Sequence, residues 1–121
     1  MYYINIEGEN NMLKMNLEFV NGILFCRLKG ALNRKSTYKI NSYLLPTLIK
    51  HKIKFLVYNM YELSDIDDLG CEALLNTKSA IKNNKGKIYL CECSGDILDK
   101  VKRLHIKRTE SERTALQVIE V

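Results

Sequence analysis

Hydrophobic and polar residues alternate along residues 12–20, which predicts a strand with one buried face. The alternating apolar positions are Leu13, Met15, Leu17 and Phe19. Asn21-Gly22 follows directly and is a strong signal for a tight hairpin turn. Residues 23–28 then form a second apolar run. The pattern therefore predicts an opening antiparallel hairpin, and residues 2–6 are a candidate for an added edge strand.

After this hairpin the apolar spacing becomes that of helices alternating with strands. Helical spacing occurs in four segments: residues 34–50, 69–84, 94–104 and a last one beginning at Ser111. Two nearly continuous apolar runs, residues 53–60 and 87–93, are typical of strands covered on both faces, and a brief strand is expected near Ile106. This order predicts a single α/β domain with about four helices. Its mixed sheet has an antiparallel opening hairpin and a parallel centre.

Local signals refine the first and last helices. Ser36 is a candidate N-cap for the first helix. Pro46 lies inside that helix and has no amide hydrogen, so we expect a kink or an early end there. In the last helix the spacing is expected to turn three side chains inward: Ala115, Leu116 and Ile119.

The composition is that of an ordinary globular domain. The chain has 121 residues, of which 46% are hydrophobic and 27% charged, so one domain with one core is expected. No apolar stretch approaches the length of a membrane span, and the first residues do not resemble a secretion signal. We therefore expect a soluble, cytoplasmic protein without a membrane partner. The net charge is +5, but Glu110 and Glu112 interrupt the basic C-terminal stretch, so direct nucleic-acid binding is not expected.

The four cysteines are Cys26, Cys71, Cys91 and Cys93. Their even number is compatible with two disulfides, but three of them lie in apolar runs, which favours reduced, buried thiols acting as small hydrophobic groups. A zinc site would need closely paired Cys or His ligands at ligand spacing. Cys91 and Cys93 form one Cys-x-Cys on an expected strand, with His51 and His105 far away in the sequence. No metal site is predicted.

Acidic residues gather in the turn expected at residues 63–71, where a strand gives way to a helix. Asp65, Asp67 and Asp68 lie just where free backbone amides and the helix dipole favour negative charge. Helix capping by Asp67 or Asp68 is the simplest interpretation. The sequence contains no glycine-rich phosphate loop and no nucleophile with an evident base. We therefore predict neither enzymatic activity nor a cofactor.

Five segments, taken in order, resemble the STAS domain. They are residues 28–33, 55–60, 66–70, 84–90 and 114–116. The resemblance spans about residues 12–120, which divides the chain into an N-terminal extension (1–11) and a STAS domain (12–121). In bacterial anti-sigma factor antagonists, this domain binds an anti-sigma factor that is also a protein kinase. Phosphorylation of a serine in one turn reverses that binding.

The resemblance also shows where this chain departs from the family pattern. The family turn typically reads Asp-Ser-Ser-Gly, and the matching residues here are Asp67, Asp68, Leu69 and Gly70. Leu69 takes the position of the phosphorylated serine and has no hydroxyl, so the usual switch cannot operate there. Two interpretations remain. In the first, Leu69 gives a permanently binding-competent domain; in the second, Asp68 resembles a fixed phosphorylated state, or the surface has been adapted to another use. We prefer the first, because a carboxylate carries less charge and fewer acceptors than a phosphate.

The leading functional hypothesis is a regulatory interaction module that binds an anti-sigma factor or related kinase-like protein. The expected partner-binding residues are Asn33, Ser36, Asp67, Asp68, Leu69, Gly70 and Cys71. Asn33 stands where many family members have Asp. Ser64 and Ser36 are candidate substitute phosphorylation sites.

Two alternatives belong to other functional classes. One is a scaffold subunit of a larger sensory or transport assembly, in which residues 2–6 would support a homo-oligomer by edge pairing. The other is a nucleotide-binding domain with weak hydrolysis, which the absence of a phosphate loop disfavours.

Overall fold

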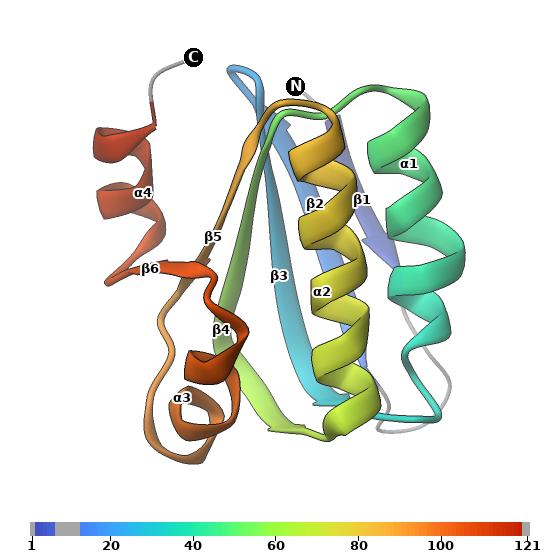
Figure 1. The fold of residues 1–121 in the computed structure, drawn as a ribbon, viewed down its shortest axis with the longest axis vertical. Helices are drawn as coiled ribbons and strands as arrows, with labels where there is room; N and C mark the ends of the chain where they lie inside the picture. Colours follow the sequence, from blue (N-terminus) through green and yellow to red (C-terminus); the bar gives the residue numbers. More distant parts are fainter. Residues whose placement is uncertain (1, 7–12, 120–121) are drawn as a thin grey trace.

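A computed structural model describes residues 2–6 and 13–119, with side chains described from Leu13 onward. Within these ranges the chain forms one six-stranded sheet in the order β1-β2-β3-β4-β5-β6. The strands are β1 (Tyr2–Ile6), β2 (Lys14–Val20), β3 (Ile23–Leu32), β4 (Phe55–Ile66), β5 (Lys87–Cys91) and β6 (Lys107–Thr109). The first three strands pair antiparallel and the other three continue the sheet in parallel. The predicted mixed sheet is confirmed, with β1 at one edge (Figure 1).

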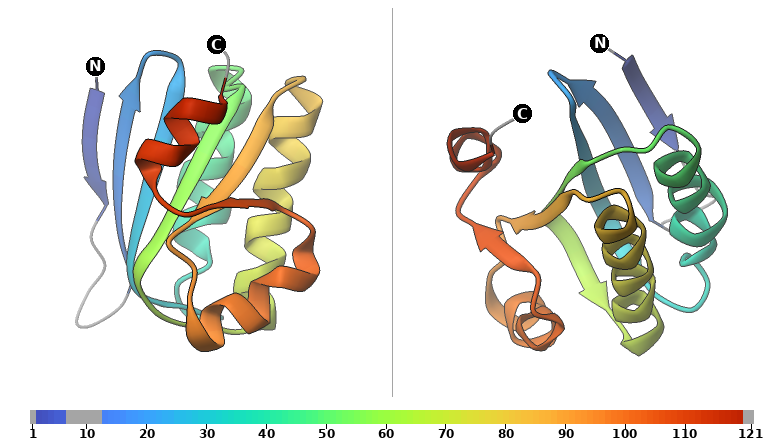
Figure 2. Two further views of the ribbon diagram at one scale, coloured as in Figure 1. Left: turned by 90° about the vertical axis from the view of Figure 1, so that its left-hand side faces the viewer. Right: turned by 45° about the horizontal axis from the view of Figure 1, so that its top comes forward.

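The helices cover both faces of the sheet. They are α1 (Leu45–Lys50) with a preceding π-helical segment η1 (Lys39–Leu44), α2 (Asp68–Asn83), α3 (Gly95–Val101) with a following 3₁₀ turn η2 (Lys102–Leu104), and α4 (Glu112–Val118). Figures 1 and 2 show α1 and α2 side by side on one face and α4 on the other. The larger apolar core lies on the first face and includes side chains of α3. A smaller core lies under α4, around Phe25, Val57, Tyr89 and Ala115.

The hairpin turn agrees with its sequence signal, whereas two strand ends do not. Asn21 and Gly22 both have positive φ, 51° and 83°, as the tight turn between twisted strands requires. β4 does not end at Met60 as its apolar run predicts, but continues to Ile66. β5 ends at Cys91, because Glu92 adopts a left-handed conformation with φ 58° that ends the extended strand before Cys93.

In the first helix the early end, one of the two outcomes predicted at Pro46, does not occur, and the cap predicted at Ser36 is wrong. The helix does not end at Pro46, since α1 continues to Lys50. The turn before the proline widens instead, and the Leu45 amide donates to the carbonyl of Ile40, five residues back. Ser36 is not the N-cap, because the helical turns begin later and carry no side-chain cap bond.

The last helix begins at Ser111 as predicted, but one of the three residues predicted to face inward is wrong. The Ser111 hydroxyl accepts a hydrogen bond from the Thr114 amide at 3.1 Å. Ala115 and Ile119 are buried, four residues apart on one face, whereas Leu116 is 46% exposed. Leu116 lies about 100° further around the helix than Ala115, away from its buried side.

The four cysteines are free thiols, and Cys26, Cys71 and Cys91 are buried. Burial raises the pKa of the Cys91 thiol to about 12 and that of the half-buried Cys93 to about 11. These side chains therefore remain protonated and act as small apolar groups, in agreement with the favoured interpretation.

A polar cluster fixes α4 to the open face of the sheet. Arg27 on β3 donates two hydrogen bonds to the Glu112 carboxylate, at 2.8 and 2.7 Å. Asn59 on β4 donates a third to the same carboxylate at 2.8 Å. Hydrogen bonding from Arg27 lowers the pKa of Glu112 below its usual 4.5. Glu112 is therefore the residue that ties the first turn of α4 to two central strands.

We expect Glu112→Gln to lower the free energy of unfolding by about 1–2 kcal/mol at pH 7, since it removes a partly buried, charge-assisted pair. The folded state lowers the Glu112 pKa, so this stabilisation is present above pH 4.5 and disappears as pH falls through the lowered value. Urea denaturation at neutral and acidic pH should therefore show a difference that narrows in acid. Glu110→Gln, at an exposed residue two positions earlier, is the control and should change little. An equal loss of unfolding free energy in both variants would contradict the role of Glu112 in tying α4 to the sheet.

Candidate functional site

The candidate site begins where β3 and β4 end next to each other. Their parallel pairing continues to Leu32 opposite Ile66, and the Asp67 amide then donates to the Leu32 carbonyl at 3.2 Å. The loop after β3 and the start of α2 are therefore adjacent. The predicted long turn at residues 63–71 is wrong, because strand and helix are separated by Asp67 alone.

Asp67 joins this loop to the helix with one carboxylate. Its Oδ1 accepts from the Gly70 amide at 2.8 Å, which caps the helix. Its Oδ2 accepts from the Arg34 amide in the neighbouring loop at 3.0 Å. The capping predicted from the acidic cluster is therefore made by Asp67.

Gly70 permits the helix to start this close to the sheet. A Cβ at this position would lie 2.4 Å from the Leu32 carbonyl oxygen and 2.7 Å from a side-chain carbon of Ile66. Both contacts are far shorter than van der Waals distance, and the first is to backbone. Glycine is therefore required by close approach here, independently of any partner.

The loop after β3 is built by two polar side chains. The Asn33 side-chain oxygen accepts from the Lys35 amide at 2.9 Å. The Ser36 hydroxyl donates to the Ala31 carbonyl at 2.7 Å and accepts from the Asn33 amide at 2.9 Å. Ser36 is fully buried, so neither a docking partner nor a kinase can reach it in this conformation. Ser64, in contrast, is exposed on β4.

The other predicted site residues divide between surface and interior. Leu69 is 43% exposed in the first turn of α2, and the Asp68 side chain beside it is 94% exposed. Gly70 and Cys71 are buried. The accessible surface at the helix start is therefore made by Asp68 and Leu69, with Asn33 half-buried in the adjacent loop.

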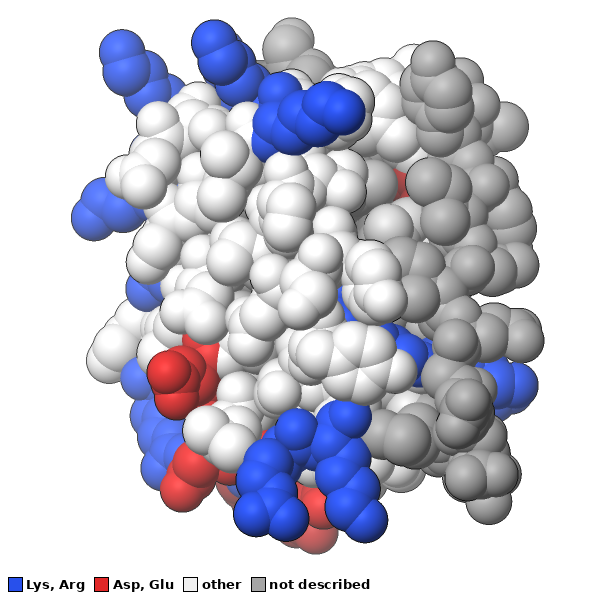
Figure 3. All heavy atoms as spheres, turned by 90° about the vertical axis from the view of Figure 1, so that its right-hand side faces the viewer, with Lys and Arg blue, Asp and Glu red and all other residues white. Residues whose placement is uncertain are grey.

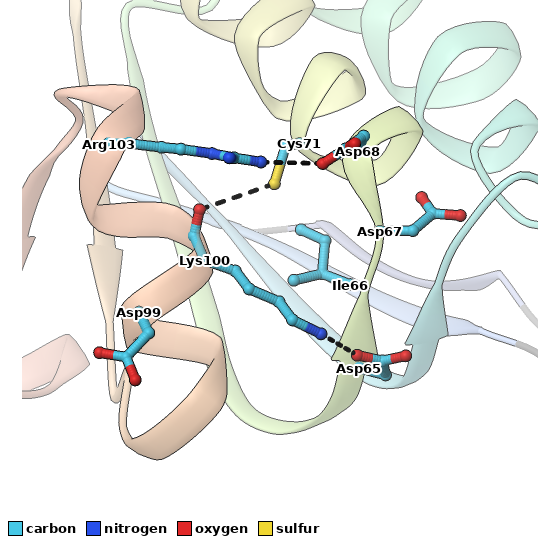
Figure 4. A pocket seen from close by; sticks show the side chains of 8 residues that line it. All are labelled: Asp65, Ile66, Asp67, Asp68, Cys71, Asp99, Lys100 and Arg103. Atoms are coloured by element: carbon cyan, nitrogen blue, oxygen red, sulfur yellow. Dashed lines mark hydrogen bonds and ion pairs between the residues drawn. The ribbon is translucent and has the colours of Figure 1, made fainter.

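Two basic residues that the sequence analysis did not select complete the surroundings. Lys100 pairs with Asp65 at 2.7 Å, and Arg103 pairs with Asp68 at 2.8 Å. Figure 4 shows both reaching from the α3–η2 segment toward β4 and α2. They border a cleft of about 450 Å³, lined by Asp65, Ile66, Asp67, Asp68, Cys71, Asp99, Lys100 and Arg103. The sequence does contain a signal for these two residues: they are three positions apart on a helical segment, which places them on one face of it.

The aspartates of this site do not converge on a common point. Asp65 faces Lys100, Asp67 faces backbone amides and Asp68 faces Arg103 (Figure 4). The hydrogen bond from Lys100 lowers the pKa of Asp65. Among the described residues no group of three or more His, Cys, Asp or Glu is arranged to hold a metal ion. No helix in the same residues is both long and apolar enough to cross a membrane.

The family model for the STAS domain matches residues 14–118. The chain belongs to the STAS domain family. β1 precedes the matched region, and the proposed division of the chain at residues 11 and 12 stays a prediction.

Solved structures with the same fold include two forms of one anti-sigma factor antagonist. Unphosphorylated SpoIIAA is 20% identical, with a TM-score of 0.73 over 85% of this STAS domain chain and 94% of that chain. The phosphorylated form of Bacillus SpoIIAA is 19% identical, with a TM-score of 0.69 over 87% and 99% of the two chains. The murine anion transporter Slc26a9 is 14% identical, with a TM-score of 0.69 over 83% of this chain and 18% of that one. These likenesses show the shared fold.

We expect Asp67→Ala to lower the free energy of unfolding by about 1–2 kcal/mol, because it removes both the helix cap and the tie to the Arg34 loop. Asp68→Ala is the matched control. It removes an exposed ion pair, so it should leave the free energy of unfolding nearly unchanged. Chemical denaturation of both variants checks this. If Asp68→Ala were the more damaging of the two, the assignment of Asp67 as the joining residue would be wrong.

Proposed function

We propose that this STAS domain is a cytoplasmic regulatory module that docks to an anti-sigma factor or related kinase-like protein. The docking surface comprises the start of α2, at Asp68 and Leu69, and the adjacent loop after β3. It binds without being phosphorylated at the usual family position. The proposal takes up the likeness to the anti-sigma factor antagonists and adapts it to this chain's own residues.

One observation carries this proposal: Leu69 is an exposed leucine at the family's switch position. Its side chain is 43% exposed and lies in the first turn of a capped helix. A well-packed apolar contact surrounded by polar groups is the usual centre of a protein interface. A leucine also offers no oxygen to a kinase, so docking here would be constitutive.

Asp68 does not act as a fixed phosphate in this proposal. Its carboxylate faces Arg103 at 2.8 Å, so an opposite charge from the same chain already lies beside it. A phosphate carries about −1.5 to −2 charges and three strong acceptors. Asp68 therefore leaves the surface with much less excess negative charge than a phosphoserine would.

A scaffold role in a larger assembly is the second candidate. It is favoured by the likeness to a domain of the anion transporter Slc26a9 and by β1, whose outer side has no partner strand in the described sheet. A row of free backbone groups on such a strand favours pairing with another chain. This candidate predicts a stable oligomer by light scattering, and a monomer at high concentration would contradict it.

Binding of the purified chain to candidate anti-sigma kinases, measured by calorimetry, tests the docking proposal. We expect Leu69→Lys to weaken binding by about tenfold or more, because it places a charge at the centre of the interface. Leu75→Lys is the matched control, since Leu75 is 36% exposed on the same helix and should bind like the parent. Asp68→Lys should weaken binding less than Leu69→Lys. Unchanged affinity in both site variants would show that this surface is not the docking site.

Incubation of the kinase with ATP, followed by intact mass measurement, tests the missing switch. The parent chain should keep its mass, whereas Leu69→Ser should gain one phosphate and then lose affinity for the kinase. Leu75→Ser supplies a hydroxyl elsewhere on α2 and should remain unmodified. A phosphate on the parent chain would contradict binding that is independent of phosphorylation, and Ser64 would then be the first candidate for the modified residue.

A further inference from the structure

On the docking surface, two acidic side chains of β4 and α2 form ion pairs within the described part of the chain, whereas the basic side chains of the loop after β3 do not. Of the three aspartates at the end of β4 and the start of α2, Asp65 and Asp68 are paired with Lys100 and Arg103 of the same chain, and Asp67 accepts from two backbone amides. Arg34 and Lys35, in the loop after β3, are exposed and have no acidic partner among the residues that the structure describes. The uncompensated charge of this loop is therefore positive.

Both basic residues extend from a backbone that is held in place. The Arg34 amide is bonded to Asp67 at 3.0 Å, and the Lys35 amide is bonded to Asn33 at 2.9 Å. A fixed backbone reduces the entropy that must be lost when a partner engages the side chains. This loop is thus prepared to present two positive charges beside the helix start.

An uncharged surface adjoins the two basic residues. η1 runs beside α2, with Asn76 donating to Asn41 at 3.1 Å as a further tie. Tyr38, the residue before η1, and Leu69, in the first turn of α2, are each 43% exposed. Figure 3 shows a face whose centre is largely uncharged, with basic side chains at its upper and lower edges and acidic side chains beside those at the lower edge.

The opposite charge on this surface is small. Glu72, one turn after Asp68, is exposed and has no ion pair among the described residues. A second acid without an ion pair among these residues, Asp67, is half-buried, and its two oxygens already accept from the Gly70 and Arg34 amides. Among the described residues of this surface, the exposed charges without a partner are therefore two positive, on Arg34 and Lys35, and one negative, on Glu72.

We propose that the partner presents an acidic protein segment, whose carboxylates bind Arg34 and Lys35 while its apolar side chains contact Leu69 and Tyr38. This rests on the proposed docking function and adds the chemistry of the partner. Complementary charge across an interface steers association and excludes partners of the wrong sign. Apolar contact beside the charges favours a protein segment over a phosphate backbone alone.

Two matched peptides test the charge preference without any natural partner. One is rich in glutamate and leucine, and the other has lysine in place of every glutamate. In NMR titrations, the acidic peptide should shift the amide signals of Arg34, Lys35 and Leu69, and the basic peptide should not. Arg34→Glu with Lys35→Glu should weaken the acidic peptide by about tenfold. The control combines Lys54→Glu with Lys87→Glu, which makes the same charge change at exposed residues at the opposite strand ends. It should change the affinity for the acidic peptide by less than about twofold.

Several results would overturn this proposal. The first is an equal loss of affinity for the acidic peptide in both double variants. The second is a set of shifted amide signals that lies away from the helix start. The third is binding of the lysine peptide as tight as that of the glutamate peptide. Binding to phosphatidylserine vesicles and to a single-stranded RNA is measured for comparison. Tighter Arg34- and Lys35-dependent binding to either one than to the acidic peptide would also overturn it.

The anti-sigma kinase separates this inference from the proposed function. If a kinase binds the parent and the Arg34→Glu, Lys35→Glu variant equally well, the acidic-segment proposal fails and the docking function stands. If no kinase binds, but the acidic peptide and the variants behave as expected, the docking function to a kinase fails and the charge preference stands. Circular dichroism of each double variant verifies that the fold is intact.

Discussion

The parallel pairing of β3 with β4 is the constraint on which the candidate site depends. The two strands remain paired from Ile23 opposite Phe55 to Leu32 opposite Ile66, through two shifts of register. Because they run in the same direction, the segments that follow them leave the same edge of the sheet. Asp67 can then bond the Gly70 and Arg34 amides at once. If β4 ended at Met60, the loop and the helix start would not meet.

The interior keeps this edge of the sheet in a fixed position. Its buried polar side chains are satisfied, as Tyr58 with Thr77 at 2.8 Å shows, and no buried side-chain nitrogen or oxygen lacks a partner in the described residues. Lys39 is only 1% exposed and donates to the Leu13 carbonyl, which joins η1 to the start of β2. Such bonds are costly to leave unmade in a low-dielectric core, so they favour one packing of helix on sheet. The docking surface is therefore carried on a rigid framework.

Periodicity predicted the elements well where one face of the chain is buried, and failed where polar contacts decide. The hairpin, the central strands and the four helical regions follow from local spacing. The end of β4 could not be found this way, because its register shifts break the alternation and residues 63–66 read as a polar turn. Ser36 shows the same limit. A serine before a helix has the signature of a cap, but this hydroxyl closes a turn onto Ala31, which only the folded loop reveals.

The interpretation of Leu69 and Asp68 depends on contacts that cannot be read from the sequence. From the sequence, an aspartate beside the family's switch position is compatible with a phosphate mimic as well as with a simple surface acid, and only the smaller charge of a carboxylate argues against the mimic. The geometry favours the surface acid, because Arg103 lies beside Asp68 and offsets part of the charge that a mimic would have to present to a partner. An ion pair this exposed contributes little to stability, so its main effect is to match charge locally. With Asp65 and Asp68 paired, the proposed binding determinants are the exposed Leu69 and the basic loop at Arg34 and Lys35.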